Sequence, residues 1–181
     1  MDLNRRKFIK DASLVSAGVI AGVSGVSAAS SSMSSQSYRR IIGSNDRLNV
    51  GIVGFSSRAK GSLIPAFQGH TKQQNCQIVG VSDIWNRRRD EGKAFLEKTT
   101  GNKIETWRNN EEMYDKNQID AVIISTADFQ HALHTVQAAN AKKDVYVEKP
   151  FAETMEDARL GRKAANDADI VLQVGSQRRL S

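Results

Sequence analysis

The repeated alternation of short apolar runs with amphipathic segments constrains the fold of this chain more than any other feature. From residue 49 onward, apolar runs predict strands at residues 50–54, 77–82, 121–125, 144–147 and 170–174, and residues 103–107 are a weaker third strand. Segments with helical spacing lie between them, at residues 86–99, 111–116, 130–141 and 155–167. Strands that alternate with helices form βαβ units, and right-handed crossovers then predict an α/β fold with a doubly wound parallel sheet in the order 3-2-1-4-5-6. In such a sheet, ligands bind outside the carboxyl ends of the strands.

The loop after the first predicted strand has the spacing of a phosphate-binding loop. Residues 54–59 read Gly-Phe-Ser-Ser-Arg-Ala, at the place where a dinucleotide-binding loop has G-x-G-x-x-G/A. Gly54 permits the tight turn, but Ser56 replaces the second glycine and narrows the approach to a pyrophosphate. The Ser56 hydroxyl and the Arg58 guanidinium can each bind phosphate oxygens. Pro65 suits the first turn of a helix, so we expect the helix to begin late and to leave a longer loop over the phosphates.

Asp83 is placed to bind the adenosine ribose, because it ends the second predicted strand. A carboxylate at this position repels a 2′-phosphate, which favours NAD over NADP. Arg87 and Arg88 lie one helical turn further on and can partly compensate, so NADP stays open. The alternative is that Asp83 only ends the strand or caps the next helix.

Glu148, Lys149 and Pro150 follow the apolar run 145–147 and therefore belong at the carboxyl edge of the sheet. A lysine at this edge can hold a cofactor, polarise an oxygen or transfer a proton. The alternative is that Glu148 and Lys149 form a salt-bridged pair that only ends the strand.

Taken together, these motifs resemble the glucose-fructose oxidoreductase / inositol dehydrogenase family (Gfo/Idh/MocA), whose N-terminal domain has the Rossmann fold. The resemblance covers residues 49–179, and its most specific parts are residues 148–150, 126–132 and 175–179. It implies a nicotinamide enzyme that transfers hydride to or from a sugar, a cyclitol or a related polyol.

The resemblance also implies roles for individual residues. Lys149 matches the family lysine beside the nicotinamide, which orients the substrate hydroxyl and assists proton transfer. His131 matches the family histidine of the loop T-P-x-x-x-H, in which Ala127 replaces the proline, and we expect it to be catalytic. The alternative for His131 is a solvated histidine at a helix N-terminus. Gln177 lies where the family places an amide near the nicotinamide. The full set of expected cofactor-binding residues is Gly54, Phe55, Ser56, Ser57, Arg58, Asp83, Ser125, Thr126, Asp128, Glu148 and Gln177.

The domain boundaries follow from the same resemblance. We expect the Rossmann domain at residues 47–175 and the start of a linker at residues 176–181. The family carries a further C-terminal α+β domain that supplies substrate contacts, an acid–base partner and oligomer contacts, and we expect that domain to be absent from this chain. On that expectation the chain alone binds cofactor without useful turnover, and the full-length form is a homo-oligomer.

The first residues read as an export signal. Residues 4–10 match the twin-arginine pattern except for the usual Ser or Thr before the arginine pair, and a mildly apolar stretch follows at residues 12–26. We expect cleavage after Ala28 and a flexible, serine-rich linker at residues 29–46. The apolar stretch is too short for a stable membrane anchor. The twin-arginine machinery exports folded proteins, so this signal predicts a periplasmic or otherwise exported protein that binds its cofactor before export. The alternative is a basic N-terminus before a chance apolar helix.

Composition narrows the remaining function classes. The chain has one cysteine and three histidines, which argues against a metal site. The net charge of +6 comes from scattered residues with few aromatics, so we expect no nucleic-acid partner. Two alternatives to a simple oxidoreductase remain. One is a glycoside hydrolase of the same fold that retains NAD and oxidises the sugar transiently, and the other is a nucleotide-binding module without catalysis.

Overall fold

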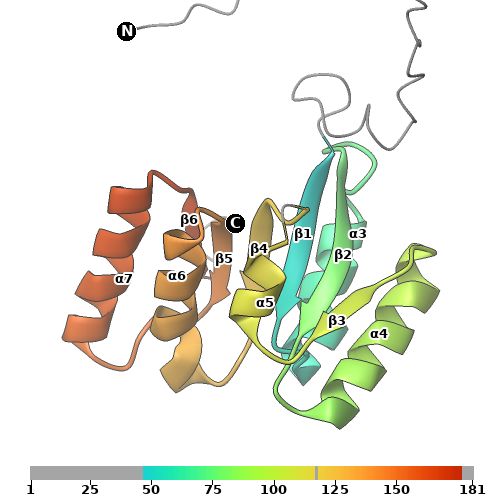
Figure 1. The fold of residues 1–181 in the computed structure, drawn as a ribbon, viewed down its shortest axis with the longest axis horizontal. Helices are drawn as coiled ribbons and strands as arrows, with labels where there is room; N and C mark the ends of the chain where they lie inside the picture. The colour runs from blue at the N-terminus through green and yellow to red at the C-terminus, as the bar shows by residue number, and fades with distance from the viewer. Residues whose placement is uncertain (1–46, 117, 177–181) are drawn as a thin grey trace, which may run out of the picture. The chain divides into compact units, whose positions relative to one another are not determined.

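The computed structural model describes residues 47–116 and 118–176, which form a six-stranded sheet flanked by helices (Figure 1). All strand pairs are parallel, in the order β3-β2-β1-β4-β5-β6. This is the predicted doubly wound order, so the fold prediction is confirmed. The strands are β1 Leu48–Val53, β2 Cys76–Ser82, β3 Glu105–Trp107, β4 Ala121–Ile124, β5 Asp144–Glu148 and β6 Leu172–Gly175.

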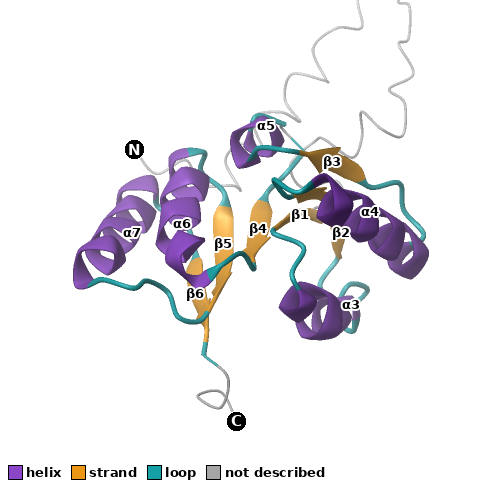
Figure 2. Cartoon of the chain, turned by 90° about the horizontal axis from the view of Figure 1, so that it is seen from below, coloured by secondary structure: helices purple, strands orange, loops and turns teal. Residues whose placement is uncertain are grey.

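Helices cover both faces of the sheet, as Figure 2 shows. On one face lie α3 and α4, and on the other lie α5, α6 and α7. The helices are α3 Ile64–Gln68, α4 Asn86–Thr100, α5 Asn110–Tyr114, α6 His131–Asn140 and α7 Met155–Ala168, with short turns η1 Ala59–Leu63 and η2 Asp128–Gln130. None of the helices in the described ranges is long and apolar enough to cross a membrane.

The alternation of side chains along each strand divides the apolar core into two layers. Ile52 packs with Leu96 under α4, whereas the next residue, Val53, packs with Val122 on the opposite face. All four of these side chains are at most 1% exposed. A strand buried on both faces reads as a continuous apolar run, which is why these segments were recognisable from the sequence.

The edge strand β3 is held by a contact that only glycine permits. The ring of Trp107 lies directly over Gly80 of the neighbouring strand, so that a Cβ atom added to Gly80 would lie 2.2 Å from Trp107 Cζ3. The indole thus takes the space of the missing side chain and fixes this short strand against the sheet.

The expectation that the first helix begins late is wrong. Helical geometry begins at Ser57 and continues through the π-helical turn η1 into α3. Pro65 lies in the first turn of α3 and has no N–H to donate, and the preceding turn is widened so that Ile64 N donates to Ala59 O. The proline is therefore accommodated by a π-helical turn rather than by a longer loop.

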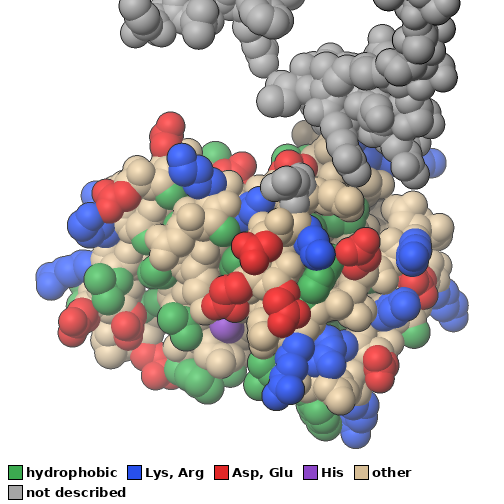
Figure 3. Space-filling view, in the orientation of Figure 1, with side chains coloured by type: hydrophobic (Ala, Val, Ile, Leu, Met, Phe, Trp, Pro, Cys, Tyr) green, Lys and Arg blue, Asp and Glu red, His purple; other side chains and the backbone are tan. Residues whose placement is uncertain are grey.

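The described surface carries charges of both signs. Lysine, arginine and acidic side chains are interspersed over the face drawn in Figure 3, without a continuous basic track on that face.

Candidate active site

The carboxyl ends of β1, β2 and β4 surround a crevice of about 620 Å³. Its walls include the loop after β1, the residues that follow β2 and the loop after β4, together with side chains of α5 and α6. This is the edge where the sequence places its candidate cofactor residues, and several of them lie in the crevice wall.

Gly54 makes the turn that opens the crevice. It has φ +83°, and its N–H donates to Ser82 O at 2.8 Å. A Cβ atom at this position would lie 2.9 Å from Ser125 O and 3.0 Å from Thr126 Cα. Both the left-handed backbone and the close approach of β4 therefore require glycine here.

The structure explains why serine replaces the second glycine of the loop at position 56. Its hydroxyl accepts a hydrogen bond from Ala59 N at 3.1 Å and forms a second hydrogen bond with the hydroxyl of Ser125, which is 2% exposed. Ser56 therefore satisfies an N–H at the start of the helix and joins the loop to the end of β4. The serine that replaces glycine fixes the loop in place before any ligand binds.

Asp83 has the structural role that the sequence left as an alternative, and its binding of the ribose stays a prediction. Its carboxylate accepts from Phe55 N at 3.0 Å and from Trp85 N at 2.9 Å, so it holds the loop after β1 and the start of α4. Each carboxylate oxygen has more than one acceptor position, so the group can still accept ribose hydroxyls. The Phe55 side chain is 1% exposed in the core, which leaves only its backbone to face the crevice.

The partner of Glu148 is Arg58, not Lys149. Glu148 is 4% exposed at the end of β5, and its Oε1 accepts from Arg58 Nε at 2.9 Å. The alternative of a Glu148–Lys149 salt bridge is therefore wrong. The observed ion pair joins residues that are 90 positions apart. It connects the phosphate-binding loop to the carboxyl end of β5, next to Lys149.

Lys149 is the exposed cation of this edge. Within residues 47–116 and 118–176, its ammonium group forms no hydrogen bond or ion pair. A small hollow of about 320 Å³ brings it together with seven other predicted residues. These are Ser56, Arg58, Ser125, Thr126, Asp128, His131 and Glu148. Ser57 is exposed at the helix start and lines the larger crevice instead.

His131 lies inside the protein rather than on a solvated surface. It is 1% exposed; its Nδ1 lies 2.6 Å from Pro150 O, and its Nε2 lies 3.3 Å from Thr126 O. A neutral imidazole donates from one nitrogen only, so it hydrogen-bonds one of these carbonyls at a time. The ring thus holds the segment after Lys149 against the loop after β4. A catalytic role for His131 stays a prediction. Direct proton transfer by its ring would require the contact with Pro150 O or the contact with Thr126 O to break.

The sequence did not identify the polar network at the α5 side of the crevice. Ser82 Oγ donates to Asn110 Oδ1 at 2.8 Å, and Asn110 Nδ2 lies 2.8 Å from His134 Nδ1. Burial lowers the pKa of His134, although hydrogen bonding to Gln137 and the charge of Glu111 oppose this effect. His134 is therefore a neutral structural histidine that joins α6 to α5. The available signal was the spacing of His134 and Gln137, which places both on one side of α6.

Other predictions lie outside the described residues. They are the twin-arginine segment, the serine-rich linker at residues 29–46, and residues 177–181 of the expected C-terminal linker, which include Gln177. Within residues 47–116 and 118–176, no three His, Cys, Asp or Glu side chains are grouped so that they could hold a metal ion.

Known proteins identify the fold and its class of cofactor. A family model described as "Oxidoreductase family, NAD-binding Rossmann fold" (GFO_IDH_MocA) matches residues 48–176. Oxidoreductase P35 of Formosa agariphila is 30% identical over 74% of this chain and 39% of its own length. A glycosyl hydrolase family 109 protein of Solibacter usitatus is 28% identical over 85% of this chain and 34% of its own length.

A solved structure with bound cofactor has the same fold. The WlbA dehydrogenase of Chromobacterium violaceum, in complex with NADH and UDP-GlcNAcA, is 25% identical with a TM-score of 0.65. The similarity covers 74% of this chain and 36% of that protein, so the chain spans little more than a third of its length. The loop at Gly54, the carboxylate of Asp83 and the crevice between them fit a bound dinucleotide. This chain belongs to the Gfo/Idh/MocA oxidoreductase family and contains its NAD-binding Rossmann domain.

Proposed function

We propose that this chain is the cofactor-binding part of an NAD(P)-dependent oxidoreductase that acts on a CH–OH group of a sugar, a cyclitol or a related polyol. The observation that carries the proposal is the position of Lys149, an exposed cation without a partner in the described part of the chain, in the same hollow as Ser56 and Thr126. When bound, the nicotinamide supplies or accepts the hydride. Lys149 orients the substrate hydroxyl and stabilises the charge that develops as its proton leaves.

The other residues bind and orient the dinucleotide. The helix begins near Ser57, directly after the phosphate-binding loop, and a helix N-terminus favours the negative charge of a pyrophosphate. Asp83 accepts the ribose hydroxyls. The ion pair with the buried Glu148 holds the exposed Arg58 side chain at this edge of the sheet.

The surroundings of Asp83 favour NAD over NADP. Arg88 forms an ion pair with Glu91 at 3.1 Å, and the Arg87 guanidinium lies 4.5 Å from the centre of the Trp85 ring. Both arginines therefore have other contacts, which weakens their ability to offset the repulsion between Asp83 and a 2′-phosphate.

Binding and turnover test this proposal separately. We expect the full chain to quench or shift NADH fluorescence on binding, and to bind NADH more tightly than NADPH. In the enzyme, Lys149→Met should retain NADH binding and lose turnover, with Lys98→Met, exposed in the last turn of α4, as the matched control. NADH binding without turnover in the enzyme would instead support the non-catalytic alternative, and absence of NADH binding would contradict the proposal.

A glycoside hydrolase is the second candidate, because one relative that covers 85% of this chain is named a glycosyl hydrolase family 109 protein. Such an enzyme would transfer hydride from the sugar to NAD, eliminate the aglycone, add water to the resulting double bond and return the hydride, so that its cofactor is regenerated in each cycle. Cleavage of a chromogenic glycoside without added NAD would favour this candidate. Net reduction of a supplied sugar by NADH would favour the oxidoreductase.

We also propose export through the twin-arginine route, which residues 4–10 and the apolar stretch 12–26 support. A retained cofactor suits this route, since the protein would leave the cytoplasm with NAD already bound. Cell fractionation tests it: replacing Arg5 and Arg6 by lysine should keep the protein in the cytoplasm. Unchanged fractionation of that variant would contradict the proposal.

A further inference from the structure

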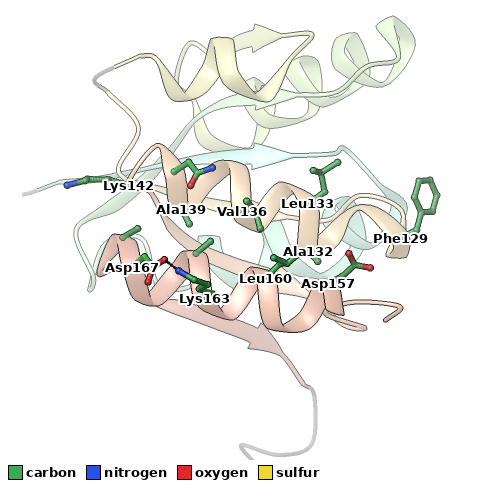
Figure 4. Close-up of a pocket in the computed structure, with 13 residues that line it drawn as sticks. Phe129, Ala132, Leu133, Val136, Ala139, Lys142, Asp157, Leu160, Lys163 and Asp167 are labelled. Carbon is green, nitrogen blue, oxygen red and sulfur yellow. Dashed lines mark hydrogen bonds and ion pairs between the residues drawn. The ribbon is translucent and has the colours of Figure 1, made fainter. Parts of the chain in front are cut away.

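The hydroxyl groups of Ser56 and Ser125 meet where the two hollows of the site join. The larger crevice contains Asp83 and the smaller hollow contains Lys149, and the residues that line both are Ser56, Ser125 and Thr126. A dinucleotide that reaches from Asp83 to Lys149 therefore passes the two serines with its middle part, which is the pyrophosphate. The groove between α6 and α7 in Figure 4 shares no lining residue with either hollow, so this path stays clear of it.

The hydrogen bonds around the two serines leave one hydroxyl hydrogen without an acceptor. Each serine carries one hydroxyl hydrogen, and the hydrogen bond between the two side chains uses only one of them. Ser56 Oγ also accepts from Ala59 N at 3.1 Å, which adds a donor and not an acceptor. In residues 47–116 and 118–176, neither hydroxyl forms a further hydrogen bond. One O–H group can therefore donate to a ligand.

Burial assigns this free hydrogen to Ser56. Ser125 is 2% exposed, so its hydroxyl needs an acceptor inside the protein, and Ser56 Oγ is that acceptor. Ser56 is less buried and lies at the wall of both hollows. Its oxygen then accepts from both Ser125 Oγ and Ala59 N, which fills its two acceptor positions and leaves its own hydrogen for the hollows.

Ser56 also changes which donor the phosphate-binding loop offers. The Ala59 N–H is among the first N–H groups of the helix, which have no partner within the helix and can bind phosphate. Because Ser56 accepts this N–H, it is not available to a ligand. We propose that the Ser56 hydroxyl, held by Ser125, donates a hydrogen bond to a phosphate oxygen of the bound dinucleotide in place of this backbone donor. The inference rests on dinucleotide binding in the crevice and assigns one donor within it.

Substitutions of the two serines in the full chain test the proposal. Ser56→Ala removes the donor but keeps a side chain in the path, so it should raise the dissociation constants of NADH and ADP-ribose by about tenfold or more. Ser56→Gly should raise them by only about threefold, because it also frees the Ala59 N–H. Ser125→Ala should raise them by less than about threefold, since the Ser56 hydroxyl can still donate to phosphate.

The matched control is Ser62→Ala, a substitution in the same helical segment. Ser62 lines neither hollow and forms no hydrogen bond through its side chain in the described ranges, so its variant should bind both ligands like the wild type. Circular dichroism must show that each variant folds. If Ser56→Ala does not fold, Ser56→Gly decides by the same measurements, because glycine is tolerated at the start of a helix.

A ligand without phosphate separates this role of Ser56 from a purely structural one. Fluorescence titration measures the binding of NADH, and competition with NADH measures the binding of ADP-ribose and adenosine. Loss of the helix cap would distort the loop and weaken all three ligands, whereas loss of a phosphate contact leaves adenosine binding unchanged. Equal weakening of adenosine and ADP-ribose, or wild-type affinity of Ser56→Ala for NADH, would overturn the proposal. A wild-type chain that binds none of these ligands would overturn it together with NAD binding by this chain.

Discussion

The ion pair between Arg58 and Glu148 predicts an asymmetric response to mutation. The Glu148 side chain is 5% exposed and that of Arg58 is 40% exposed, so the carboxylate depends on its partner far more than the guanidinium does. Arg58→Ala leaves a buried carboxylate without a partner. Glu148→Gln retains an oxygen that can accept from Arg58 Nε, and water can solvate the rest of the guanidinium.

The structure sets the size of the effect. Removing one partner of a fully buried pair costs about 3–5 kcal/mol, and because water can reach this site past Arg58, we expect about 2 kcal/mol for Arg58→Ala. Glu148→Gln should cost about 1 kcal/mol, since a hydrogen bond persists. For a domain of this size, the Arg58→Ala cost corresponds to a decrease in Tm of roughly 6 °C. The double variant should be less destabilised than the sum of the single variants, because the unpaired charge is gone.

Urea unfolding followed by circular dichroism measures these free energies. The matched control is Arg88→Ala, which removes a partly exposed ion pair with Glu91 within α4 and should change stability much less. Equal effects of Arg58→Ala and Arg88→Ala, or additive effects of Arg58→Ala and Glu148→Gln, would show that Glu148 does not depend on Arg58 and would refute the reasoning.

Three further substitutions test other parts of the fold. Gly54→Ala should destabilise the protein by about 2 kcal/mol and weaken NADH binding, because φ is +83° and Ser125 O would be 2.9 Å from the new Cβ; urea unfolding and fluorescence titration measure both. Gly80→Ala should cost about 1–3 kcal/mol and change tryptophan fluorescence, since the indole of Trp107 must move. Burial lowers the pKa of His134 from 6.5, so the unfolded chain binds a proton that the folded chain does not, and stability should fall as the pH drops below about 6.5. His134→Gln should reduce that loss in pH-dependent unfolding, and an unchanged pH dependence would contradict this account.

The strands and their order could be predicted because all but the edge strand β3 are short and mainly apolar, and the handedness of the crossovers leaves one doubly wound order. The positions of Gly54 and Asp83 followed from their places after the first two strands. The sequence could not show which side chains from different loops pair with each other at the edge of the sheet. Glu148 has a lysine next to it in the sequence but pairs with Arg58 on another loop, since the chain direction at the end of β5 turns the carboxylate toward the phosphate-binding loop.

The burial of His131 was unpredictable for a similar reason. Its place at the start of α6 is readable from the sequence, but its contacts with Pro150 O and Thr126 O depend on how two loops meet. The π-helical turn before Pro65 also escaped prediction, because a sequence pattern of helical period does not distinguish a widened turn from an interrupted helix.

The two tryptophans make the chain its own optical probe. Trp85 is 51% exposed in the wall of the crevice, whereas Trp107 is packed over Gly80. Indole emission overlaps the absorption of reduced nicotinamide, so excitation of Trp85 should transfer energy to NADH bound in the crevice. Replacing Trp107 by phenylalanine would leave Trp85 as the single donor, and binding could then be followed without any attached label.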